Sequence, residues 1–321
     1  MAVRPQSIKV RVAEVVPVTP LVKRFRFVPL AGGLLPAFSG GAHTVVEMHD
    51  GAVVRRNPYS LMGSPDELDS YQISVRKVED SRGGSVFMHE RVKAGDVMAV
   101  SPPVNLFAIA WDARKHLLLA GGIGITPFIS QMIQLDRSEM PFELHYCIRN
   151  DDRGPYWREL QQRYGRRVQV HRAESGLGMD VEALLAMQPL GTHLFVCGPG
   201  PMIEGVYATA RGLGWPDENL HSERFQAPAT GAAFDVALRR SGKRVHVGTH
   251  ESLLEAIEAA DVEAPYLCRG GACGQCETGV LACDGRLIHN DHYLSAEERA
   301  AGRKIMPCVS RFEGRELVLD L

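Results

Sequence analysis

The chain has 321 residues, of which 45% are hydrophobic and 23% charged, and its formal net charge is −2. This composition is typical of a globular protein, and the near-neutral charge argues against a nucleic-acid-binding protein, which usually carries a basic patch. The length suits two or three domains. The first residues lack the apolar core of a signal peptide, so we expect a cytoplasmic protein.

Residues 1–105 contain short runs with alternating hydrophobic and polar side chains, separated by turn residues. This pattern predicts a small antiparallel β-barrel. One of its turns, Arg82-Gly83-Gly84-Ser85, combines a guanidinium, glycine N–H groups and a hydroxyl, which together suit a phosphate. A second candidate is Tyr59-Ser60, after a proline. Each segment is also compatible with an ordinary barrel turn.

Residues 106–228 alternate between strand-like and helix-like runs, which predicts a parallel sheet with crossover helices. Within them, the stretch Leu117–Leu135 carries no charge and approaches the length of a membrane span. Its three glycines and one proline instead favour a buried strand, a glycine turn and a helix. We therefore expect no membrane insertion.

Two predicted strands of this region end in glycine-rich turns. The residues concerned are Gly121, Gly122, Gly124, Cys197, Gly198 and Pro199. Ligands of open α/β sheets bind at the carboxyl ends of strands, so the two turns together indicate a nucleotide site. The first turn departs from the G-x-G-x-x-G pattern, because Pro127 occupies the third glycine position. Cys197 fits either a buried core position or a place beside a nicotinamide.

A small, uncharged segment at 226–233 predicts a linker, and the last region, 229–321, contains short strands, one helix and a cysteine loop. Cys268, Cys273 and Cys276 have the C-x4-C-x2-C spacing that precedes a remote fourth cysteine in plant-type [2Fe–2S] proteins. Cys308 supplies that fourth thiol. A four-cysteine zinc site is the alternative, although zinc sites usually combine two separate cysteine pairs.

Two further expectations concern this last region. Cys283 lies outside the four-cysteine pattern, which predicts a small buried residue. Arg269 lies inside the cysteine loop and, because it is polar, is expected to be exposed. It is then either a contact for a protein partner or an ordinary solvated charge.

The three sets of motifs together resemble the phthalate dioxygenase reductase family, over essentially the whole chain. The resemblance implies a multidomain fold: an FMN-binding antiparallel β-barrel (1–105), an NAD-binding α/β domain with a parallel sheet (106–228) and an α+β, β-grasp ferredoxin domain (229–321). The family's flavin motif is Arg-x-Tyr-Ser, but here Asn57 stands at the arginine position and Arg56 is one residue early. Reductases that serve carnitine monooxygenase are similar in this asparagine.

The resemblance also implies roles for individual residues. The residues implied to act at the reacting centre are Ser60, Thr126, Cys197 and Glu223. The residues implied to bind FMN or NADH are Arg56, Asn57, Tyr59, Ser60, Arg82, Gly83, Gly84, Ser85, Gly121, Gly122, Gly124, Thr126, Pro127, Cys197, Gly198, Pro199 and Phe225. The implied cluster ligands are Cys268, Cys273, Cys276 and Cys308. The resemblance leaves open whether Arg56 or Arg82 binds the FMN phosphate.

The implied activity is electron transfer from NADH through FMN and a [2Fe–2S] cluster to a Rieske-type oxygenase. A flavin is needed because a hydride carries two electrons, whereas the cluster accepts one. The segment 147–154 offers Arg149 and Arg153 but also Asp151 and Asp152, so its local charge does not favour NADPH, whose 2′-phosphate would require a basic cluster. The alternatives are a different acceptor, such as a hydroxylase or a cytochrome, and a redox sensor without turnover.

Overall fold

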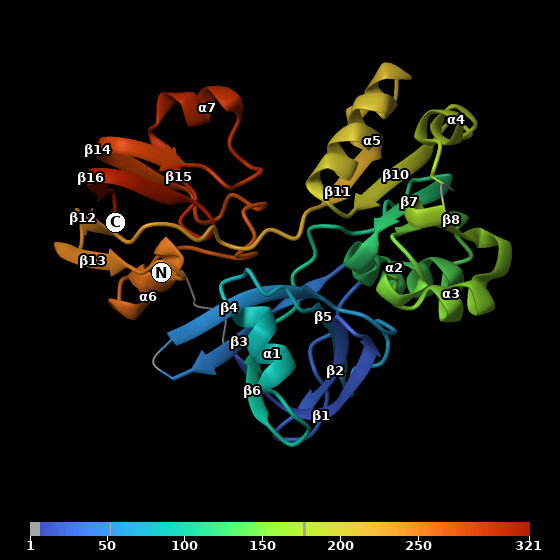
Figure 1. The fold of residues 1–321 in the computed structure, drawn as a ribbon, viewed down its shortest axis with the longest axis horizontal. Helices are drawn as coiled ribbons and strands as arrows, with labels where there is room; N and C mark the ends of the chain where they lie inside the picture. Colours follow the sequence, from blue (N-terminus) through green and yellow to red (C-terminus); the bar gives the residue numbers. More distant parts are fainter. Residues whose placement is uncertain (1–6, 52, 176–177) are drawn as a thin grey trace.

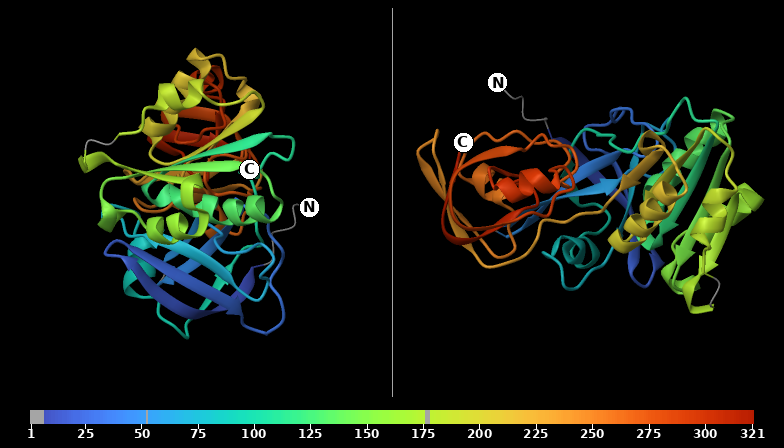
Figure 2. Two further views of the ribbon diagram at one scale, coloured as in Figure 1. Left: turned by 90° about the vertical axis from the view of Figure 1, so that its right-hand side faces the viewer. Right: turned by 90° about the horizontal axis from the view of Figure 1, so that it is seen from above.

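The computed structural model describes residues 7–51, 53–175 and 178–321. Its strands form three sheets, each built from one stretch of the chain (Figure 1). The part with the second sheet and the part with the third lie side by side above the part with the first (Figures 1 and 2). The three parts meet at the centre of the molecule.

The first sheet is antiparallel, with the strand order β4-β3-β6-β1-β2-β5. Its elements are β1 (Ile8–Thr19), β2 (Val22–Pro29), β3 (His43–Asp50), β4 (Val53–Ser60), β5 (Tyr71–Arg76), helix α1 (Gly84–Glu90) and β6 (Val97–Val100). The amide of Met62, just after β4, donates to the carbonyl of Gln72 in β5 at 2.8 Å. This bond joins the two outer strands and closes the barrel around inward side chains such as Phe25 and Ile73.

The second sheet is parallel, with the strand order β11-β10-β7-β8-β9. Its strands are β7 (Lys115–Gly121), β8 (Phe142–Ile148), β9 (Val168–Arg172), β10 (Thr192–Cys197) and β11 (Leu220–Glu223), and its helices are α2 (Thr126–Arg137), α3 (Trp157–Tyr164), α4 (Val181–Ala186) and α5 (Gly200–Gly212). Short 3₁₀ turns are η1 (Gly122–Ile125), η2 (Asp151–Arg153), η3 (Gly165–Arg167), η4 (Ala173–Ser175) and η5 (Asp217–Asn219). Two separate apolar clusters cover the two faces, one with α2 and α3 and one with α4 and α5.

The uncharged stretch Leu117–Leu135 forms most of β7, the turn η1 and most of α2, as its glycines and proline predict. Within the described ranges, no helix is long and apolar enough to cross a membrane.

The third sheet is mixed, with the strand order β13-β12-β16-β14-β15 and a parallel pair β12–β16. Its elements are β12 (Phe234–Leu238), β13 (Lys243–Val247), helix α6 (Leu253–Ala259), β14 (Thr278–Ile288), helix α7 (Ala296–Ala301), β15 (Lys304–Ile305) and β16 (Arg311–Leu319). The three predicted architectures are thereby confirmed: an antiparallel barrel, a parallel α/β sheet and a mixed α+β sheet.

The prediction for Cys283 is wrong, because this residue is exposed in the middle of β14. Register shifts occur on both sides of it, between Val280 and Ala282 and between Asp284 and Gly285. Such irregularities bend and twist a strand, and the segment 281–286 is exposed on both faces.

The segment 226–233 is irregular and runs from the second sheet to the third. The side chain of Arg311, 2% exposed, donates to three of its carbonyls: Ala229 at 3.4 Å, Gly231 at 3.4 Å and Ala232 at 2.8 Å. It also donates to the carbonyl of Glu251 at 2.7 Å. One buried guanidinium therefore fixes half of the segment onto the third part of the chain.

Candidate functional site

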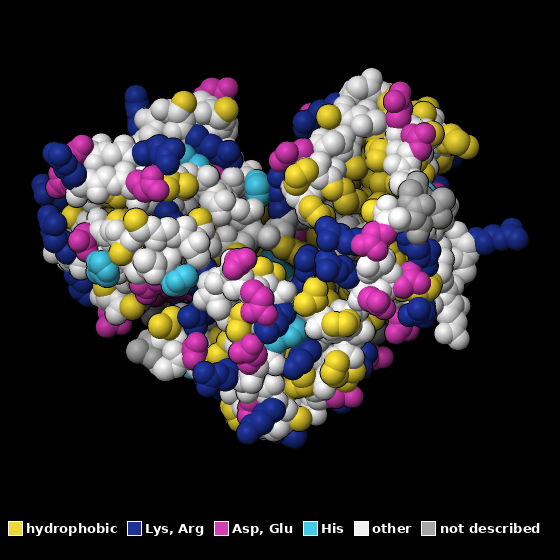
Figure 3. All heavy atoms as spheres, viewed as in Figure 1, with side chains coloured by type: hydrophobic (Ala, Val, Ile, Leu, Met, Phe, Trp, Pro, Cys, Tyr) yellow, Lys and Arg dark blue, Asp and Glu magenta, His cyan; other side chains and the backbone are white. Residues whose placement is uncertain are grey.

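A cavity of about 490 Å³ lies where the three parts of the chain meet, and Figure 3 shows the hollow between them. Its volume falls in the range of small-molecule sites. The residues named from the sequence that line it are Asn57, Tyr59, Ser60, Arg82, Gly84, Ser85, Thr126, Glu223, Phe225 and Cys268. Residues from the barrel, from the α/β part and from the cysteine loop thus share one space.

Four buried polar atoms on the wall of this cavity have no hydrogen-bond partner among the described residues. They are His43 Nε2, Ser60 Oγ, Arg82 Nη1 and Glu223 Oε2. Buried polar atoms are nearly always satisfied in native proteins. Four such atoms around one cavity therefore fit a bound polar ligand, and a flavin with its phosphate offers the required acceptors and donors.

Glu223 ends β11 and lies close to Ser60 at the end of β4. Burial raises the pKa of the Glu223 carboxyl to about 8, and the nearby Ser60 hydroxyl opposes the rise. Burial, together with the Glu223 charge, also raises the pKa of the Cys197 thiol well above its usual value. Both groups are therefore protonated near neutral pH. Burial lowers the pKa of His43 to about 4, so this ring is neutral.

The raised pKa of Glu223 predicts a specific pH dependence of stability. The carboxyl ionises near 4.5 in the unfolded chain and near 8 in the folded one. Between these values the folded state holds a proton that the unfolded state has released, so this contribution to stability falls as the pH rises. In flavin-free wild-type protein, the free energy of unfolding should therefore fall by on the order of a few kcal/mol between about pH 5 and pH 8. We expect Glu223→Gln to abolish this fall.

Thermal or urea unfolding across this range measures the effect, with the exposed Glu218→Gln as the matched control. Parallel stability curves for wild type and Glu223→Gln would contradict the raised pKa.

Strand β4 decides which of its basic residues approach the cavity. Successive side chains of a strand point to opposite faces, so Arg55, Asn57 and Tyr59 share one face and Arg56 lies on the other. Arg55 Nε donates to the carbonyl of Arg82 at 2.6 Å. Arg56 Nε donates to Glu47 at 2.9 Å, and its side chain does not line the cavity. The structure therefore places Arg56 apart from the other expected flavin residues.

The turn before α1 packs against Asn57. A Cβ atom on Gly84 would lie 2.4 Å from Asn57 Nδ2, so only glycine allows the asparagine this position. Arg82 is 5% exposed, and its Nε donates to the carbonyl of His250 at 2.9 Å. With Nη2 paired to Glu255, Nη1 is the group of this guanidinium left for an anion in the cavity.

The two glycine-rich strand ends of the α/β part interlock. Strands β7 and β10 are neighbours, with Cys197 opposite Ala120. A Cβ atom on Gly124 would lie 2.3 Å from the carbonyl oxygen of Cys197, so only glycine permits this approach. Thr126 begins α2 and lines the cavity. The residues that line the cavity do not include the others expected there, namely Gly121, Gly122, Gly124, Pro127, Cys197, Gly198 and Pro199.

The four pattern cysteines are brought together as two pairs. Cys276 Sγ lies 3.3 Å from Cys308 Sγ, and Cys268 shares a hydrogen bond with Cys273. Hydrogen bonds from Cys273 and from backbone amides hold the pKa of Cys268 at about 5, which favours a thiolate. Within the described part of the chain, no three or more His, Cys, Asp or Glu side chains converge on a single point that would suit one metal ion. Two thiol pairs fit two irons better than one zinc ion.

The shape of the cysteine loop depends on Gly274, which has a φ of 75°. A Cβ atom there would lie 2.3 Å from the ring of Tyr293. Cys268, Cys276 and Cys308 are buried, whereas Cys273 is half-buried. Cys268, Gly270 and Ala272 also line the central cavity, so the loop forms part of its wall.

The expectation that Arg269 is exposed is wrong, because this side chain is 5% exposed. Its guanidinium donates two hydrogen bonds to Glu258, at 2.9 and 2.5 Å, and lies 3.8 Å from the centre of the Tyr266 ring. These contacts leave it no surface for a protein partner.

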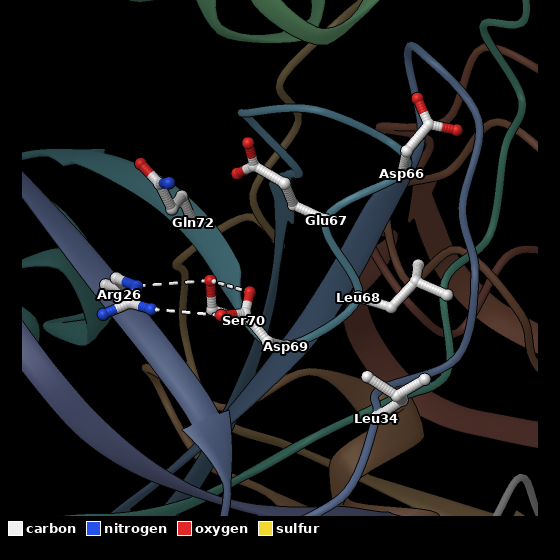
Figure 4. A pocket seen from close by; sticks show the side chains of 8 residues that line it. All are labelled: Arg26, Leu34, Asp66, Glu67, Leu68, Asp69, Ser70 and Gln72. Carbon is white, nitrogen blue, oxygen red and sulfur yellow. Dashed lines mark hydrogen bonds and ion pairs between the residues drawn. The ribbon is translucent and has the colours of Figure 1, made fainter.

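A second hollow lies beside β2, lined by Arg26, Leu34, Asp66, Glu67, Leu68, Asp69, Ser70 and Gln72 (Figure 4). Arg26 is already paired there, with Ser70 at 3.2 Å and Asp69 at 3.6 Å. None of the site residues named from the sequence lies in it, so we assign the chemistry to the central cavity.

Sequence reasoning missed several residues of the site. His43, Arg224 and His292 line the cavity, and Arg55 supports the turn that carries Arg82. Arg55 had a usable signal, since it shares the strand face of Asn57 and Tyr59. Arg224 lies between Glu223 and Phe225, which were both named, whereas His43 and His292 come from segments far apart in the sequence.

Comparison with known families finds two matches. Residues 98–220 match the family "Dimethylamine monooxygenase subunit DmmA-like, N-terminal domain". Residues 236–313 match the "2Fe-2S iron-sulfur cluster binding domain". The second match contains all four paired cysteines, Cys268, Cys273, Cys276 and Cys308.

Whole-length relatives are also found. The carnitine monooxygenase reductase subunit of Escherichia coli (strain K12) is 45% identical, over 98% of this chain and 99% of its own length. The haem-dependent oxidative N-demethylase beta subunit of Ectopseudomonas mendocina (strain ymp) is 44% identical, over 97% and 98%. Among solved structures, phthalate dioxygenase reductase, described as a modular structure for electron transfer from pyridine nucleotides to [2Fe–2S], matches with a TM-score of 0.89 and 31% identity, over 98% of both chains.

Proposed function

This chain belongs to the phthalate dioxygenase reductase family, and we propose that it delivers electrons from NADH to a Rieske-type oxygenase that is its partner. Family membership makes it an oxidoreductase with FMN, NADH and a [2Fe–2S] cluster, and a reductase subunit of an oxygenase system. The observation that carries the proposal is the central cavity. Unpartnered polar atoms surround it, and the loop of one thiol pair forms its wall.

The residues divide the work according to their positions. Tyr59, Ser60 and Asn57 would bind the flavin ring and its chain, and Arg82 Nη1 with Ser85 would bind the phosphate. When bound, the flavin supplies the conversion of a two-electron hydride into single electrons, which an iron–sulfur centre requires. Glu223 holds a proton at the cavity wall near neutral pH, where burial keeps the carboxyl neutral.

Further residues would orient the nucleotide. Thr126 and Phe225 face the cavity from the α/β side, and Cys197 is buried, with a protonated thiol. The glycines at the ends of β7 and β10 would let the nucleotide approach the backbone. Accordingly, we assign FMN to residues 1–105, NADH to 106–228 and the cluster to 229–321.

Cys268, Cys273, Cys276 and Cys308 would hold the cluster, two thiolates to each iron. The backbone amide of Gly270 donates to Cys268 Sγ at 3.4 Å, and such bonds stabilise the thiolate form that binds metal. None of the seven cysteines forms a disulfide bond, and such free thiols are typical of a reducing compartment such as the cytoplasm.

A haem-containing oxygenase is the second candidate partner. The observation in its favour is the 44% identity to a haem-dependent oxidative N-demethylase beta subunit, almost equal to the identity to the carnitine monooxygenase reductase. The flavin and cluster sites would serve either partner, so the acceptor has to be identified by experiment.

We expect the purified chain to support substrate-dependent NADH oxidation when a Rieske oxygenase subunit is added. The measurement is NADH consumption and product formation with each candidate oxygenase. Turnover with a haem oxygenase alone would support the second candidate. If the protein does not oxidise NADH even with ferricyanide as an artificial acceptor, a redox sensor without turnover is the interpretation that remains.

A further inference from the structure

The helix α6 presents two acidic residues to the barrel. Glu255 and Glu258 are three residues apart, so they lie on the same face of the helix. Figure 1 shows α6 next to the strands β3 and β4, and both carboxylates are largely buried at this contact. Capping of α6 explains part of the role of Glu255, which bonds the amide of Ser252 at 2.9 Å. It does not explain Glu258.

Glu258 binds two arginines from different parts of the chain. From its own part it receives Arg269 of the cysteine loop, through two hydrogen bonds. From the barrel it receives Arg56 Nη1, at 3.5 Å. Its side chain is 10% exposed and that of Arg269 5%, so the pair is shielded from water and from salt.

Around these residues the charges are balanced. Three guanidiniums (Arg56, Arg82, Arg269) meet three carboxylates (Glu47, Glu255, Glu258). The backbone amide of Arg56 also donates to Glu255 at 3.1 Å. Removal of one partner from such a network leaves a buried charge unpaired, which costs far more than loss of a surface pair.

The network lies next to both redox sites. Arg269 directly follows Cys268, and Arg56 directly precedes Asn57, while Cys268 and Asn57 both line the cavity. Gly270 approaches Pro58, since a Cβ atom on it would lie 3.9 Å from Pro58 Cγ. A chain of contacts through Glu258 thus fixes the cysteine loop against the strand expected to hold the flavin.

We propose that Glu258 is a positioning residue that holds the cysteine loop against β4, with Arg269 as its partner in the loop and Arg56 as its partner in the barrel. Arg56 then acts in docking and not in phosphate binding. The proposal rests on the proposed function for its consequence, since it is electron transfer between the two sites that requires their close approach. The contact itself does not depend on that function.

The test uses the full-length protein loaded with flavin and cluster. Glu258→Gln removes the charge and keeps the shape, and Arg56→Gln removes the contact with Glu258 between the two parts together with the ion pair to Glu47 within the barrel. Glu263→Gln, an exposed carboxylate of the same region, is the matched control. In each variant, hydrogen exchange is measured at the amide of position 56, and stopped-flow absorption measures flavin reduction by NADH and the following reduction of the cluster.

We expect both variants to keep wild-type flavin reduction and cluster absorption, to exchange the position-56 amide faster and to slow cluster reduction several-fold, because electron transfer weakens steeply as two sites move apart. The control should match wild type. Slow cluster reduction in Glu258→Gln with wild-type behaviour in Arg56→Gln would overturn the proposal, because Glu258 would then only fold the loop.

Loss of FMN from Arg56→Gln would also overturn it, because Arg56 would then be a phosphate ligand. If wild-type protein itself passes no electrons from NADH to the cluster, the proposed function fails. The exchange data at position 56 then still decide the docking role of Glu258.

Discussion

Replacement of Cys308 by serine should abolish electron delivery to an oxygenase and spare the reduction of flavin by NADH. Cys308 is 2% exposed and its thiol lies 3.3 Å from that of Cys276, so serine removes one thiolate of a pair and leaves a weaker ligand in a buried place. The loss should exceed the roughly 10- to 100-fold effect of losing a residue that only supports a metal ligand. NADH-dependent turnover of the oxygenase and iron content measure it.

The exposed Cys283→Ser is the matched control, because it changes a thiol of the same sheet that pairs with none of the four. Flavin reduction by NADH, followed with ferricyanide as acceptor, should stay within about twofold of wild type in both variants, as for surface changes generally. Continued delivery to the oxygenase by Cys308→Ser would show that electrons leave the chain from the flavin directly.

Replacement of Arg82 by alanine should release FMN. The Nη1 group of Arg82 is buried at the cavity wall and has no hydrogen-bond partner among the residues that the structure describes, and a hydrogen bond to a charged group contributes about 1.5–3 kcal/mol. At tenfold per about 1.4 kcal/mol, FMN binding should weaken roughly 10- to 100-fold. Titration of FMN fluorescence with flavin-free protein measures the dissociation constant.

Arg91→Ala is the control for this experiment, because Arg91 is an exposed guanidinium of the barrel part that does not line the cavity. It should change FMN affinity by less than about twofold. Because Arg82 also pairs with Glu255, a melting curve of each flavin-free variant must accompany the titration. Undiminished FMN binding in a folded Arg82→Ala protein would transfer the phosphate role to Arg55 or Arg56.

Local patterns were enough to predict the three architectures and the cysteine site. Alternation with a period of two marks strands wherever one face is buried, and the cysteine triple within nine residues contains one of the two thiol pairs, Cys268 with Cys273. Cys308 was predictable because the plant-type pattern requires a fourth thiol. That Cys308 pairs with Cys276 is seen only in the structure, where the pairing of β15 with β14 brings the two segments together.

Contacts between distant segments decided what the sequence could not show. Arg56 and Asn57 are neighbours in the chain, yet strand geometry sends their side chains to opposite faces. Arg269 is polar, but Glu258, eleven residues earlier, draws it into the interior. Glu255 resembles an ordinary helix cap in the sequence, and its contact with Arg82 spans 173 positions.

The bonds from Arg311 to the segment 226–233 bear on the kinetics of the whole protein. A linker whose carbonyls are bound is effectively shorter than its residue count suggests, and a short tether holds two partners at millimolar effective concentration. Electron transfer between the flavin site and the cysteine site of one chain is a first-order step, so its rate constant does not depend on the concentration of the protein. Encounter with the oxygenase remains second order, so the supply of oxygenase sets the dependence of turnover on concentration.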